Sequence, residues 1–252
     1  MTGSNHARAP RLFVTADLGP GAEAAFDEGQ AHYLRHVLRL EGGAPLLLFN
    51  GRDGEWRATL AHQGKRGAAA HVAAQTRAQI ASPDVWLLFA PIKRTPADFI
   101  AQKATELGVS ALMPVITRRT IVSRVNDVRM KANAIEAAEQ CERLDVPACH
   151  AAQDLMDVLG GFPADRMLVF ADEAGVDDGA AKPLAAALAP HHGQKRWALL
   201  IGPEGGFEPA ERDAIRALKQ AVPVTLGPRI LRADTAALAG LALLQANCGD
   251  WV

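Results

Sequence analysis

Residues 197–215 read WALLIGPEGGFEPAERDAI, an apolar run that breaks into a glycine-rich turn and then continues as a helical pattern. The turn, Gly202–Gly206, holds three glycines, which allow backbone conformations that other residues rarely adopt. Pro209 suits the first turn of a helix because it has no N–H to leave unsatisfied. Glu208 and Glu211 complement the positive end of the helix dipole. The stretch therefore predicts a strand, a tight turn and a helix.

The turn does not match either standard phosphate-binding loop. A P-loop requires GxxxxGK[ST], and neither a lysine nor a hydroxyl follows Gly206. A dinucleotide fingerprint requires GxGxxG after the first strand of its domain, and here both the spacing and the position differ. Since α/β proteins bind ligands at the carboxyl ends of their strands, the three glycines favour a ligand site over an ordinary strand–helix connection.

The region around this stretch alternates strand-like and helix-like segments. Near-continuous apolar runs separated by amphipathic helices predict a parallel sheet covered on both faces. The pattern begins after Ser82-Pro83, so we expect an α/β domain over residues 78–252. The expected strands lie at 85–90, 111–117, 166–172, 196–202 and 222–227, and helices are expected at 95–108, near 128–143 and after each of the last two strands.

The first 77 residues have a different pattern and predict a small β domain. An apolar run at 46–49 precedes Asn50-Gly51 and Asp53-Gly54, and alternating apolar residues follow, which predicts a hairpin. Weaker strand candidates lie at 11–14 and 68–75. The segment 27–40 predicts a short helix, with Leu34, Val37 and Leu38 on one face.

Two more turns resemble the first in position. Residues 224–238, VTLGPRILRADTAAL, place Gly227-Pro228 after a strand and leave apolar side chains in a loop. Asp234 or Thr235 can cap the helix that follows. Alone, this loop fits a buried capped turn as well as a pocket for a flat heterocycle. Residues 170–175, FADEAG, end another strand with acids. Three such turns at one sheet edge predict a cofactor site that does not require a phosphate.

Charge, cysteines and hydropathy limit the class of protein. Residues 93–131 carry eight basic residues against three acidic ones, which fits either a solvated face or a polyanion surface. The three cysteines make no CxxC pair, so reduced thiols and a cytoplasmic location are expected. The stretch MTGSNHARAP lacks the apolar core of a signal peptide, and the longest strongly apolar stretch, 236–244, is too short to cross a bilayer, so neither feature is expected. His32 and His36 are four residues apart but have no third ligand nearby, so no metal is expected.

Several segments match a known family in order along nearly the whole chain. IGPEGGFEPAE and LGPRILRADTA resemble the two signature segments of the RsmE family of 16S rRNA uridine-N3 methyltransferases, of the SPOUT class. KATELGV (103–109) and EAAEQCERLDVP (136–147) resemble its other recurrent segments. RAPRLFV with HYLRHVLRL resembles its N-terminal PUA-like barrel. One departure is Asp234, where the family usually has Glu.

The resemblance implies a fold and a cofactor. The fold would be an α/β SPOUT-type parallel sheet over 78–252, with a C-terminal trefoil knot from about Trp197 to Leu244. A small PUA-like RNA-binding β-barrel over 1–77 would precede it. S-adenosyl-L-methionine would be the cofactor. The residues implied to hold it are Ala171, Leu200, Ile201, Gly202, Gly205, Gly206, Leu226, Gly227, Ile230 and Leu231.

The implied reaction assigns roles to three further residues. Uracil N3 carries a proton, so the enzyme must accept that proton and stabilise the anion that forms. Arg232 is the candidate that binds the anion, Glu204 the carboxylate nearer the proton, and Asp234 the second. Alternatively, Glu204 holds a backbone amide of the knot and Arg232 grips a phosphate. Residues expected to follow the RNA backbone are Arg8, Arg11, Arg35, Arg39, Arg118, Arg119 and Arg124.

The partners expected are 16S rRNA or the small ribosomal subunit, and a second copy of the chain. The last helix, residues 234–247, is apolar nearly all round, which favours a homodimer interface through the knot region over a purely internal position. A nicotinamide oxidoreductase is disfavoured because VWLLFAPIKRTP, the first strand and turn, has no glycine. A non-catalytic RNA-binding assembly factor, or an enzyme that modifies another RNA uridine, remains an alternative.

Overall fold

The computed structural model describes residues 9–64, 67–92, 94–122, 125–176, 179–191 and 193–251. The chain forms two compact units. The first comprises the chain up to Ala81 together with Ala138–Asp145, and the second comprises Ser82–Ala137 and Val146–Val252. The last strand of the first unit ends at Arg77, and a short connection leads to Ser82. A segment distant in sequence therefore completes the first unit.

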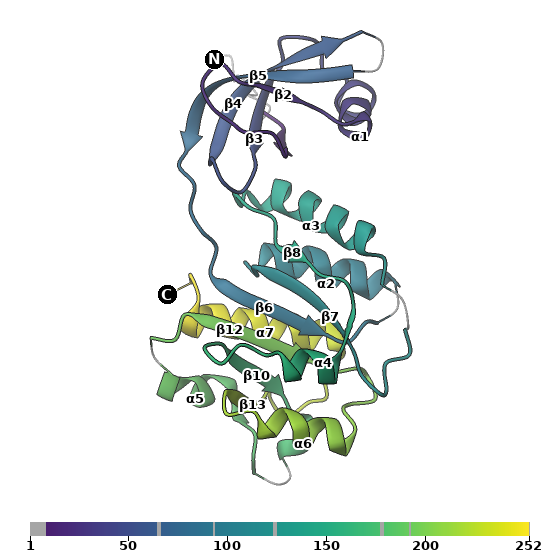
Figure 1. Cartoon of the computed structure of the whole chain (residues 1–252), viewed down its shortest axis with the longest axis vertical. Coiled ribbons are helices and arrows are strands. Elements are labelled where there is room, and N and C mark those ends of the chain that lie inside the picture. The colour runs from purple at the N-terminus through teal and green to yellow at the C-terminus, as the bar shows by residue number, and fades with distance from the viewer. Residues whose placement is uncertain are drawn as a thin grey trace, which may run out of the picture. The chain divides into compact units, whose positions relative to one another are not determined.

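The first unit is built on a curled five-stranded sheet of order β1-β3-β4-β5-β2, in which only the β1–β3 pair is parallel (Figure 1). Its elements are β1 (Arg11–Phe13), β2 (Glu23–Ala25), α1 (Glu28–His32), a π-helical turn (Tyr33–Val37), β3 (Pro45–Phe49), β4 (Glu55–Gln63) and β5 (Gly67–Arg77). The expected strands near residues 12 and 70 are confirmed as β1 and β5.

The predicted hairpin is confirmed as the antiparallel pair β3–β4. Gly51 and Gly54 both adopt positive φ, near 80°. The Asn50 side-chain oxygen accepts the backbone N–H of Arg52 at 3.0 Å and that of Asp53 at 2.9 Å. The turn is thus held by the Asn side chain and by glycines in a conformation that suits them.

The predicted helix near residue 34 is present, but Val37 does not share a face with Leu34 as predicted. Leu34 is fully buried, whereas Val37 is 60% exposed. The chain forms a π turn here, with the Leu38 N–H bonded to the Tyr33 carbonyl at 2.9 Å. Since a π turn holds an extra residue, side chains three apart no longer share one face as in an α-helix.

The second unit is an α/β layered fold with an eight-stranded sheet. Strand order along the sheet is β11-β13-β10-β12-β6-β7-β8, with β9 pairing β7, and every pair is parallel. Its strands are β6 (Asp84–Phe89), β7 (Ala111–Ile116), β8 (Ala148–Cys149), β9 (Gln153–Asp154), β10 (Met167–Ala171), β11 (Lys182–Pro183), β12 (Arg196–Ile201) and β13 (Ala221–Thr225).

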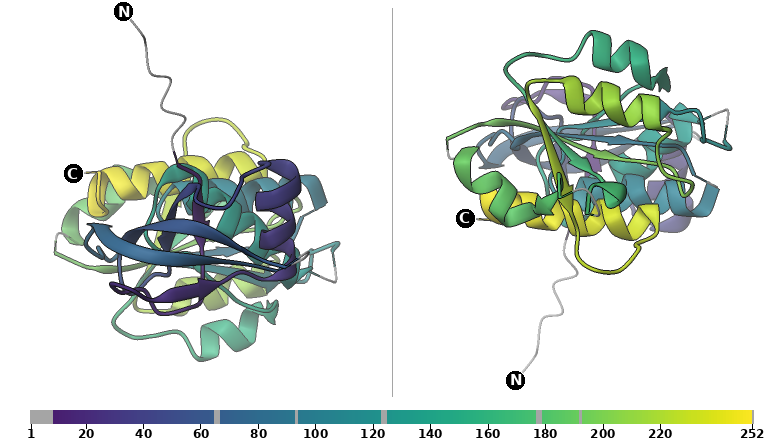
Figure 2. Two further views of the ribbon diagram at one scale, coloured as in Figure 1. Left: turned by 90° about the horizontal axis from the view of Figure 1, so that it is seen from above. Right: turned by 90° about the horizontal axis from the view of Figure 1, so that it is seen from below.

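Helices cover both faces of this sheet, as predicted (Figure 2). The helices are α2 (Arg94–Glu106), α3 (Asp127–Cys141), α4 (Leu155–Gly160), α5 (Leu184–Leu188), α6 (Pro209–Ala217) and α7 (Ala233–Cys248), with short 3-10 turns at Glu173–Val176 and Ala189–His191. Alternate residues of β12 show the two layers. Leu199 packs with α2, α5 and α7, and Leu200 packs with α4 and α6.

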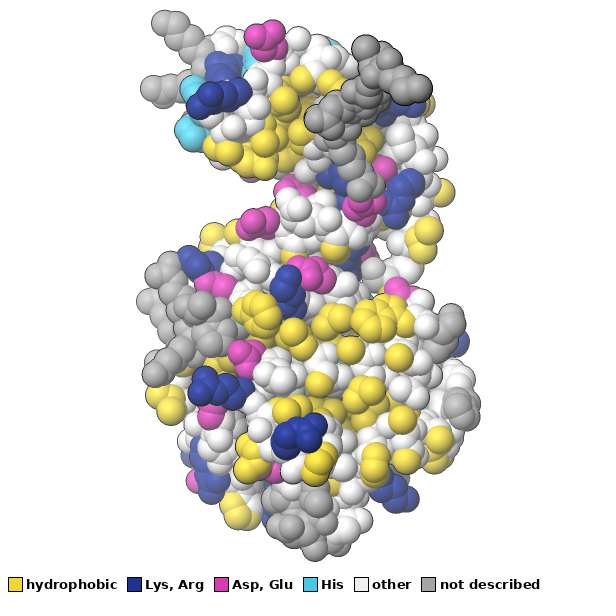
Figure 3. All heavy atoms as spheres, turned by 180° about the vertical axis from the view of Figure 1, so that it is seen from behind, with side chains coloured by type: hydrophobic (Ala, Val, Ile, Leu, Met, Phe, Trp, Pro, Cys, Tyr) yellow, Lys and Arg dark blue, Asp and Glu magenta, His cyan; other side chains and the backbone are white. Residues whose placement is uncertain are grey.

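The final helix α7 lies on one face of the sheet and packs against α2, α5 and β12. A Cβ on Gly240 would lie 2.7 Å from the Leu199 side chain, so glycine lets the helix approach the strand. The helix is not covered all round by the described chain, since Leu243 is 40% exposed. Figure 3 shows hydrophobic side chains gathered on the face of the second unit that carries α7. Among the described residues, no helix has the length and apolarity that crossing a membrane requires.

The amino-terminal edge of the sheet is closed by an ion-pair network. Arg166 is 1% exposed and donates from Nη2 to both Asp84 oxygens, at 2.8 and 2.9 Å. Its Nη1 donates to the Trp197 carbonyl at 2.8 Å, and its guanidinium carbon lies 3.5 Å from the Trp86 ring centroid. Arg196 Nε adds a 2.9 Å bond to Asp84. The starts of β6 and β12 are thereby joined.

All three cysteines are free thiols, in agreement with the expectation from sequence. Cys149 is half-buried, and burial raises the pKa of its thiol to about 11. It is therefore a packing residue and a poor nucleophile at neutral pH.

Candidate active site

The three turns predicted to form a cofactor site end three neighbouring parallel strands. The strands β13, β10 and β12 are adjacent in the sheet, and their carboxyl ends are Thr225, Ala171 and Ile201. Because all three run the same way, the turns that follow them meet at one edge. This edge is where parallel α/β sheets bind their ligands.

Two glycines of the Gly202–Gly206 turn are required for different reasons, one for its backbone conformation and the other for the space around it. Gly206 has a φ of 68° and donates its N–H to the Pro203 carbonyl at 2.8 Å. Gly202 has no such φ, but a Cβ there would lie 2.6 Å from the Phe207 ring. That ring packs edge-on against Phe170, with centroids 5.2 Å apart. Gly205 has neither a positive φ nor a close contact, so the expected special backbone conformation is confirmed only for Gly206.

The start of α6 is confirmed, and it carries a contact that the sequence did not predict. Glu208 is the N-cap residue, Pro209 follows it, and a Glu211 carboxylate oxygen accepts the Glu208 N–H at 2.9 Å. The other Glu211 oxygen accepts the backbone N–H of Arg118, in the loop after β7, at 2.8 Å. Glu211 is 4% exposed. A buried carboxylate therefore holds the loop after β7 to the turn after β12.

A second bond joins the same two loops. Arg119 donates from Nη1 to the Gly205 carbonyl at 2.8 Å. The loop after β7 thus reaches across the end of β6, which lies between β7 and β12 in the sheet. Spacing in sequence gives no signal for these contacts, because the residues they join are more than 80 positions apart.

The acidic turn after β10 is held by an internal ion pair. Asp172 is 3% exposed and accepts a 2.8 Å bond from Arg216 Nε. It also accepts the backbone N–H of Gly175 at 3.2 Å. The Asp172 N–H donates to the Val224 carbonyl at 3.0 Å, which joins this turn to the end of β13. The acid therefore shapes the turn, and Ala171 before it is half-buried.

The third turn leaves apolar and basic side chains at the surface. Gly227 has a φ of 108°, Ile230 is 82% exposed, and Leu226 and Leu231 are half-buried against the core. The predicted cap of α7 is wrong. Arg232 is the N-cap residue and the helix starts at Ala233, so Asp234 lies within the first turn.

The Asp234 carboxylate accepts the N–H of Thr235 at 2.8 Å. In the first turn it interacts favourably with the helix dipole, which is a role that either Asp or Glu could serve. The shorter side chain at this position is thus compatible with the helix start.

The two principal catalytic candidates lie at this edge. Glu204 and Arg232 are both exposed. Within the described part of the chain, neither side chain forms a hydrogen bond or an ion pair, so the alternative that Glu204 holds a backbone amide of the chain is not seen. Both groups are available to a ligand.

The predicted cofactor residues differ in what they can offer. Leu200 is fully buried among the residues of the α4 and α6 face, so its side chain is not available to a ligand at the edge. Ile201 is 3% exposed and belongs to the opposite face. The aliphatic side chains that remain for a flat ring are those of Leu226, Ile230 and Leu231. Apolar side chains with backbone amides and carbonyls, and no phosphate loop, fit a nucleoside better than a nucleotide.

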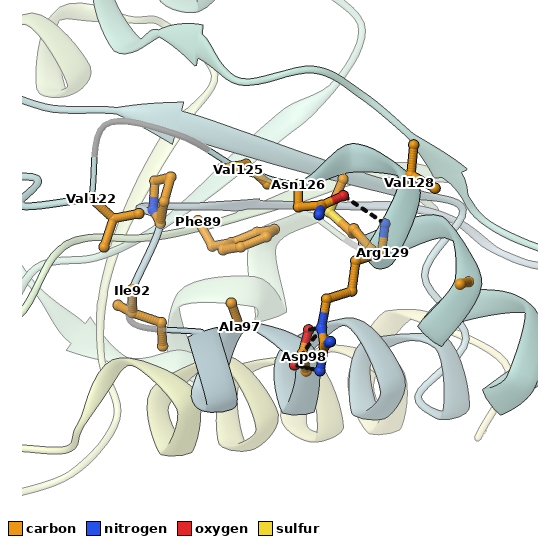
Figure 4. A pocket seen from close by; sticks show the side chains of 12 residues that line it. Phe89, Ile92, Ala97, Asp98, Val122, Val125, Asn126, Val128 and Arg129 are labelled. Atoms are coloured by element: carbon orange, nitrogen blue, oxygen red, sulfur yellow. Dashed lines mark hydrogen bonds and ion pairs between the residues drawn. The ribbon is translucent and has the colours of Figure 1, made fainter.

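A cavity of about 760 Å³ opens at the neighbouring strand, β6 (Figure 4). It is lined by Phe89, Pro91, Ile92, Ala97, Asp98, Val122, Val125, Asn126, Val128, Arg129, Met130 and Ala132. None of these residues was predicted as a site residue. Their signal in the sequence is weak, because most are aliphatic and come from three separate segments.

One of the predicted RNA-binding residues is wrong. The Arg11 side chain is only 5% exposed; its Nε pairs with Glu55 at 2.7 Å and its other nitrogens donate to the carbonyls of Ala138, Glu139 and Arg143. It is a structural residue of the first unit, since all three of its guanidinium nitrogens form internal hydrogen bonds.

The other predicted RNA-binding residues that the structure describes are more exposed. Arg35 is half-buried and donates to the carbonyls of Gly64 and Gly67. Arg39, Arg118 and Arg119 are exposed. Arg8 and Arg124 lie outside the described residues.

Comparison with known proteins gives the class that this fold and site define. The model of the RNA methyltransferase domain matches residues 80–245, and that of the RNA methyltransferase PUA domain matches residues 26–72. The protein is thus an RNA methyltransferase with an N-terminal PUA domain. Ribosomal RNA small subunit methyltransferase E of Rickettsia conorii is 30% identical over 95% of this chain and 98% of its own. The chain belongs to that family, and the resemblance seen in its signature segments is confirmed.

Two solved structures have the same architecture. The ribosomal RNA small subunit methyltransferase E of Neisseria gonorrhoeae, bound to S-adenosyl methionine, superposes with a TM-score of 0.85 at 28% identity, over 97% of this chain and 100% of that one. The putative methyltransferase Lpg2936 of Legionella pneumophila, in complex with the bound cofactor SAM, gives 0.84 at 27% identity, with the same coverage. Fold similarity therefore extends over both units.

Proposed function

We propose that this protein transfers a methyl group from S-adenosyl-L-methionine to N3 of a specific uridine in 16S ribosomal RNA of the small subunit. The observation that carries the proposal is the edge where the turns after β10, β12 and β13 meet, with Glu204 and Arg232 beside it, neither of which has a partner among the described residues. Family membership and the two neighbours solved with that cofactor support the reaction class.

The cofactor would lie in the slot formed by the three turns. Leu226, Ile230 and Leu231 would contact the adenosine ring system, and backbone groups of Ile201–Gly206 would pair with its polar atoms. When bound, the cofactor supplies an electrophilic methyl group on a positively charged sulfur. Ile230 supports this assignment because an aliphatic side chain 82% exposed in a loop gains by being covered.

The residues of the chain would activate the base. Uracil N3 is a poor nucleophile until its proton leaves, and the anion then carries its charge on O2 and O4. The Arg232 guanidinium would stabilise that charge, because it can donate two parallel hydrogen bonds. Glu204 would accept or relay the proton, with Asp234 second. The exposure of Arg232 and Glu204 supports these roles, since neither side chain is bonded to another of the described residues.

The arrangement of the chain and of its copies is part of the proposal. The segment from about Trp197 to Leu244 would thread a trefoil knot, which would bring the turns after β12 and β13 around the cofactor. A homodimer would form through the knot region. The apolar outer side of α7, including Leu243, supports this because contiguous exposed apolar surface marks interaction sites. Light scattering that shows a monomer at micromolar concentration would contradict it.

Ribosomal RNA would be held by both units, with the PUA domain, residues 1–77, binding RNA and the catalytic domain, residues 78–252, continuing the path. Arg39, Arg118 and Arg119 would contact phosphates, and Arg8, Arg35 and Arg124 would extend this path. Binding should weaken steeply with salt because each phosphate contact releases counterions. An affinity that does not change between low and physiological salt would contradict this path. The enzyme would act in the cytoplasm, where its substrate is assembled.

Mapping of methylated nucleotides tests the function directly. The pure protein and S-adenosyl-L-methionine are incubated with small ribosomal subunits that lack the modification, and the 16S rRNA is analysed by mass spectrometry. One uridine should gain a single methyl group at N3. Cofactor binding without any methyl transfer would instead indicate a non-catalytic RNA-binding or assembly factor.

A further inference from the structure

The cavity at the end of β6 lies directly beside the proposed cofactor turn. Its inner wall includes Phe89, which pairs in register with Ile201 of β12. The next residue, Ala90, donates its N–H to the Ile201 carbonyl at 3.0 Å. The cavity therefore opens one strand away from the residue that leads into the Gly202–Gly206 turn.

A single loop borders both the cavity and the turn. Arg119 binds the Gly205 carbonyl, and three residues later Val122 lines the cavity. The helix α2, which supplies Ala97 and Asp98 to the cavity, packs against α7. Both helices follow parallel strands and so begin at the same edge of the sheet. Arg232, the N-cap of α7, is thus at the same end of this helix pair as the cavity.

The described walls of the cavity are mostly apolar. Most lining residues are aliphatic, and the volume of about 760 Å³ falls within the range of roughly 300–1,000 Å³ typical of small-molecule sites. The two charged residues, Asp98 and Arg129, bind each other through Arg129 Nε at 2.7 and 2.8 Å. Asn133 adds a 2.9 Å bond to Asp98. Among the lining residues that the structure describes, the two charges of this pair therefore neutralise each other.

One polar group is placed to bind a ligand. The Asn126 side-chain oxygen accepts the Arg129 N–H at 3.0 Å, which caps α3. Its amide nitrogen faces the cavity in Figure 4 and has no hydrogen-bond partner among the residues that the structure describes. An amide N–H₂ donates to carbonyl oxygens, and uracil carries two.

We propose that this cavity receives the uracil ring of the target nucleotide, with Asn126 donating to one of its carbonyl oxygens. This inference rests on the proposed function and specifies where its substrate binds. Enzymes that modify a base take it out of its stack into a pocket with apolar walls and hydrogen bonds to the base edge. At the rim, Val128 is 82% exposed, and Arg118 and Arg119 lie on the adjoining loop where phosphates would pass.

Filling the cavity tests the proposal without removing a polar group. Ala97→Phe places a ring in the cavity from a half-buried position on α2. The expected result is a kcat/KM for unmethylated small subunits lowered by about 100-fold, because a misplaced base is no longer aligned with the methyl donor. The dissociation constant of S-adenosyl-L-methionine, measured by calorimetry, should not change. Ala185→Phe, on the exposed side of α5, is the matched control and should leave both quantities unchanged.

Each outcome of this experiment has a distinct meaning. Wild-type turnover in folded Ala97→Phe overturns the cavity as the base site. Weaker binding of S-adenosyl-L-methionine by Ala97→Phe also overturns it, since the cavity would then hold part of the cofactor. A wild-type protein that binds cofactor but methylates no uridine refutes the proposed function instead.

A second substitution keeps the proposal testable if Ala97→Phe does not fold. Asn126→Ser retains an N-cap oxygen but loses the amide donor, so the start of α3 is preserved. Loss of one hydrogen bond to the base should lower kcat/KM by about tenfold, with cofactor affinity unchanged. Asn126→Asp, which also caps, should lower it further because a carboxylate repels the uracil oxygens. Unchanged kcat/KM in both variants would overturn the proposal.

Discussion

The two edges of the parallel sheet differ in how their charged groups are used. At the amino-terminal edge, Arg166 and Arg196 both bind Asp84, and Arg166 also binds backbone carbonyls and the face of Trp86. At the carboxyl-terminal edge, Glu204 and Arg232 have no partner among the described residues.

Exposed aliphatic side chains also lie near the carboxyl-terminal edge. Ile230 and Val128, near the carboxyl-terminal edge, are each 82% exposed. Exposed aliphatic side chains, together with charged groups that have no partner among the described residues, support the proposal of a ligand site at this edge. The network at the other edge has the arrangement of a structural clamp. Substitutions at the two edges should therefore separate activity from stability.

The largest effect is expected from Arg232→Ala at the carboxyl-terminal edge. Turnover should fall by roughly 10²–10³-fold, because a donor aimed at charge that develops during the reaction is lost. Cofactor affinity, measured by calorimetry, should change little. Arg229→Ala removes an exposed arginine from the same loop and should retain activity. Equal losses of turnover and cofactor affinity in Arg232→Ala would refute its role toward the base.

The next effect is expected from Arg166→Met at the amino-terminal edge. Removing this buried partner should lower the free energy of unfolding by about 3 kcal/mol, measured with urea. Methyl transfer by the folded fraction should be unchanged. Arg196→Ala removes the exposed arginine that binds the same carboxylate. This variant should lower the free energy of unfolding by less than about 1 kcal/mol. If both variants lowered the free energy of unfolding equally, burial would not explain the contribution of Arg166 to stability.

A smaller effect, on both stability and binding, is expected from Gly202→Ala. Its Cβ would displace the Phe207 ring and should lower the free energy of unfolding by about 1–3 kcal/mol, with weaker cofactor binding because the turn shifts. Gly205→Ala meets only ordinary contacts with Arg119, at 3.5 Å, and should be tolerated. Thermal unfolding and cofactor titration compare the two. A destabilised Gly205→Ala with a normal Gly202→Ala would reverse this assignment.

The smallest effect concerns the pH dependence of stability at the amino-terminal edge. Burial alone would raise the pKa of the Asp84 carboxyl, but hydrogen bonds from Arg196 and Arg166 outweigh it and lower that pKa below its usual value. The unfolded chain then takes up the proton first, so the free energy of unfolding should fall as the pH drops below about 4. The fall should be shallower in Asp84→Asn and in Arg166→Met, measured by urea unfolding at several pH values. A slope identical in all three proteins would contradict the network.

The fold could be predicted from local patterns because its elements are locally specified. The hairpin at Asn50–Gly54 is set by residues that favour its turn, and the strands β6, β7, β10, β12 and β13 are apolar runs of the right length. Short elements such as β8, β9 and β11 have two residues each and carry no periodic signal. A regular helix would place Val37 on the same face as Leu34, whereas the π turn leaves Val37 exposed.

The candidate site could be predicted only in part. The turn at Gly202–Gly206 and the loop at Gly227–Arg232 were found because glycine, proline and charge leave a signal at strand ends. Arg11 illustrates the limit. An arginine near the N-terminus appears equally suited to RNA or to a buried role, and only the fold brings Glu55 and the carbonyls of residues 138–143 around it.

The sequence by itself determined the class of fold, the position of the three turns and the family, since these depend on the kind and spacing of neighbouring residues. Only the tertiary structure decided that Glu211 joins two loops, that Gly202 is required by Phe207, and that a cavity adjoins β6. Such contacts join residues through space, and their energies depend on distances and burial that the order of residues along the chain does not contain.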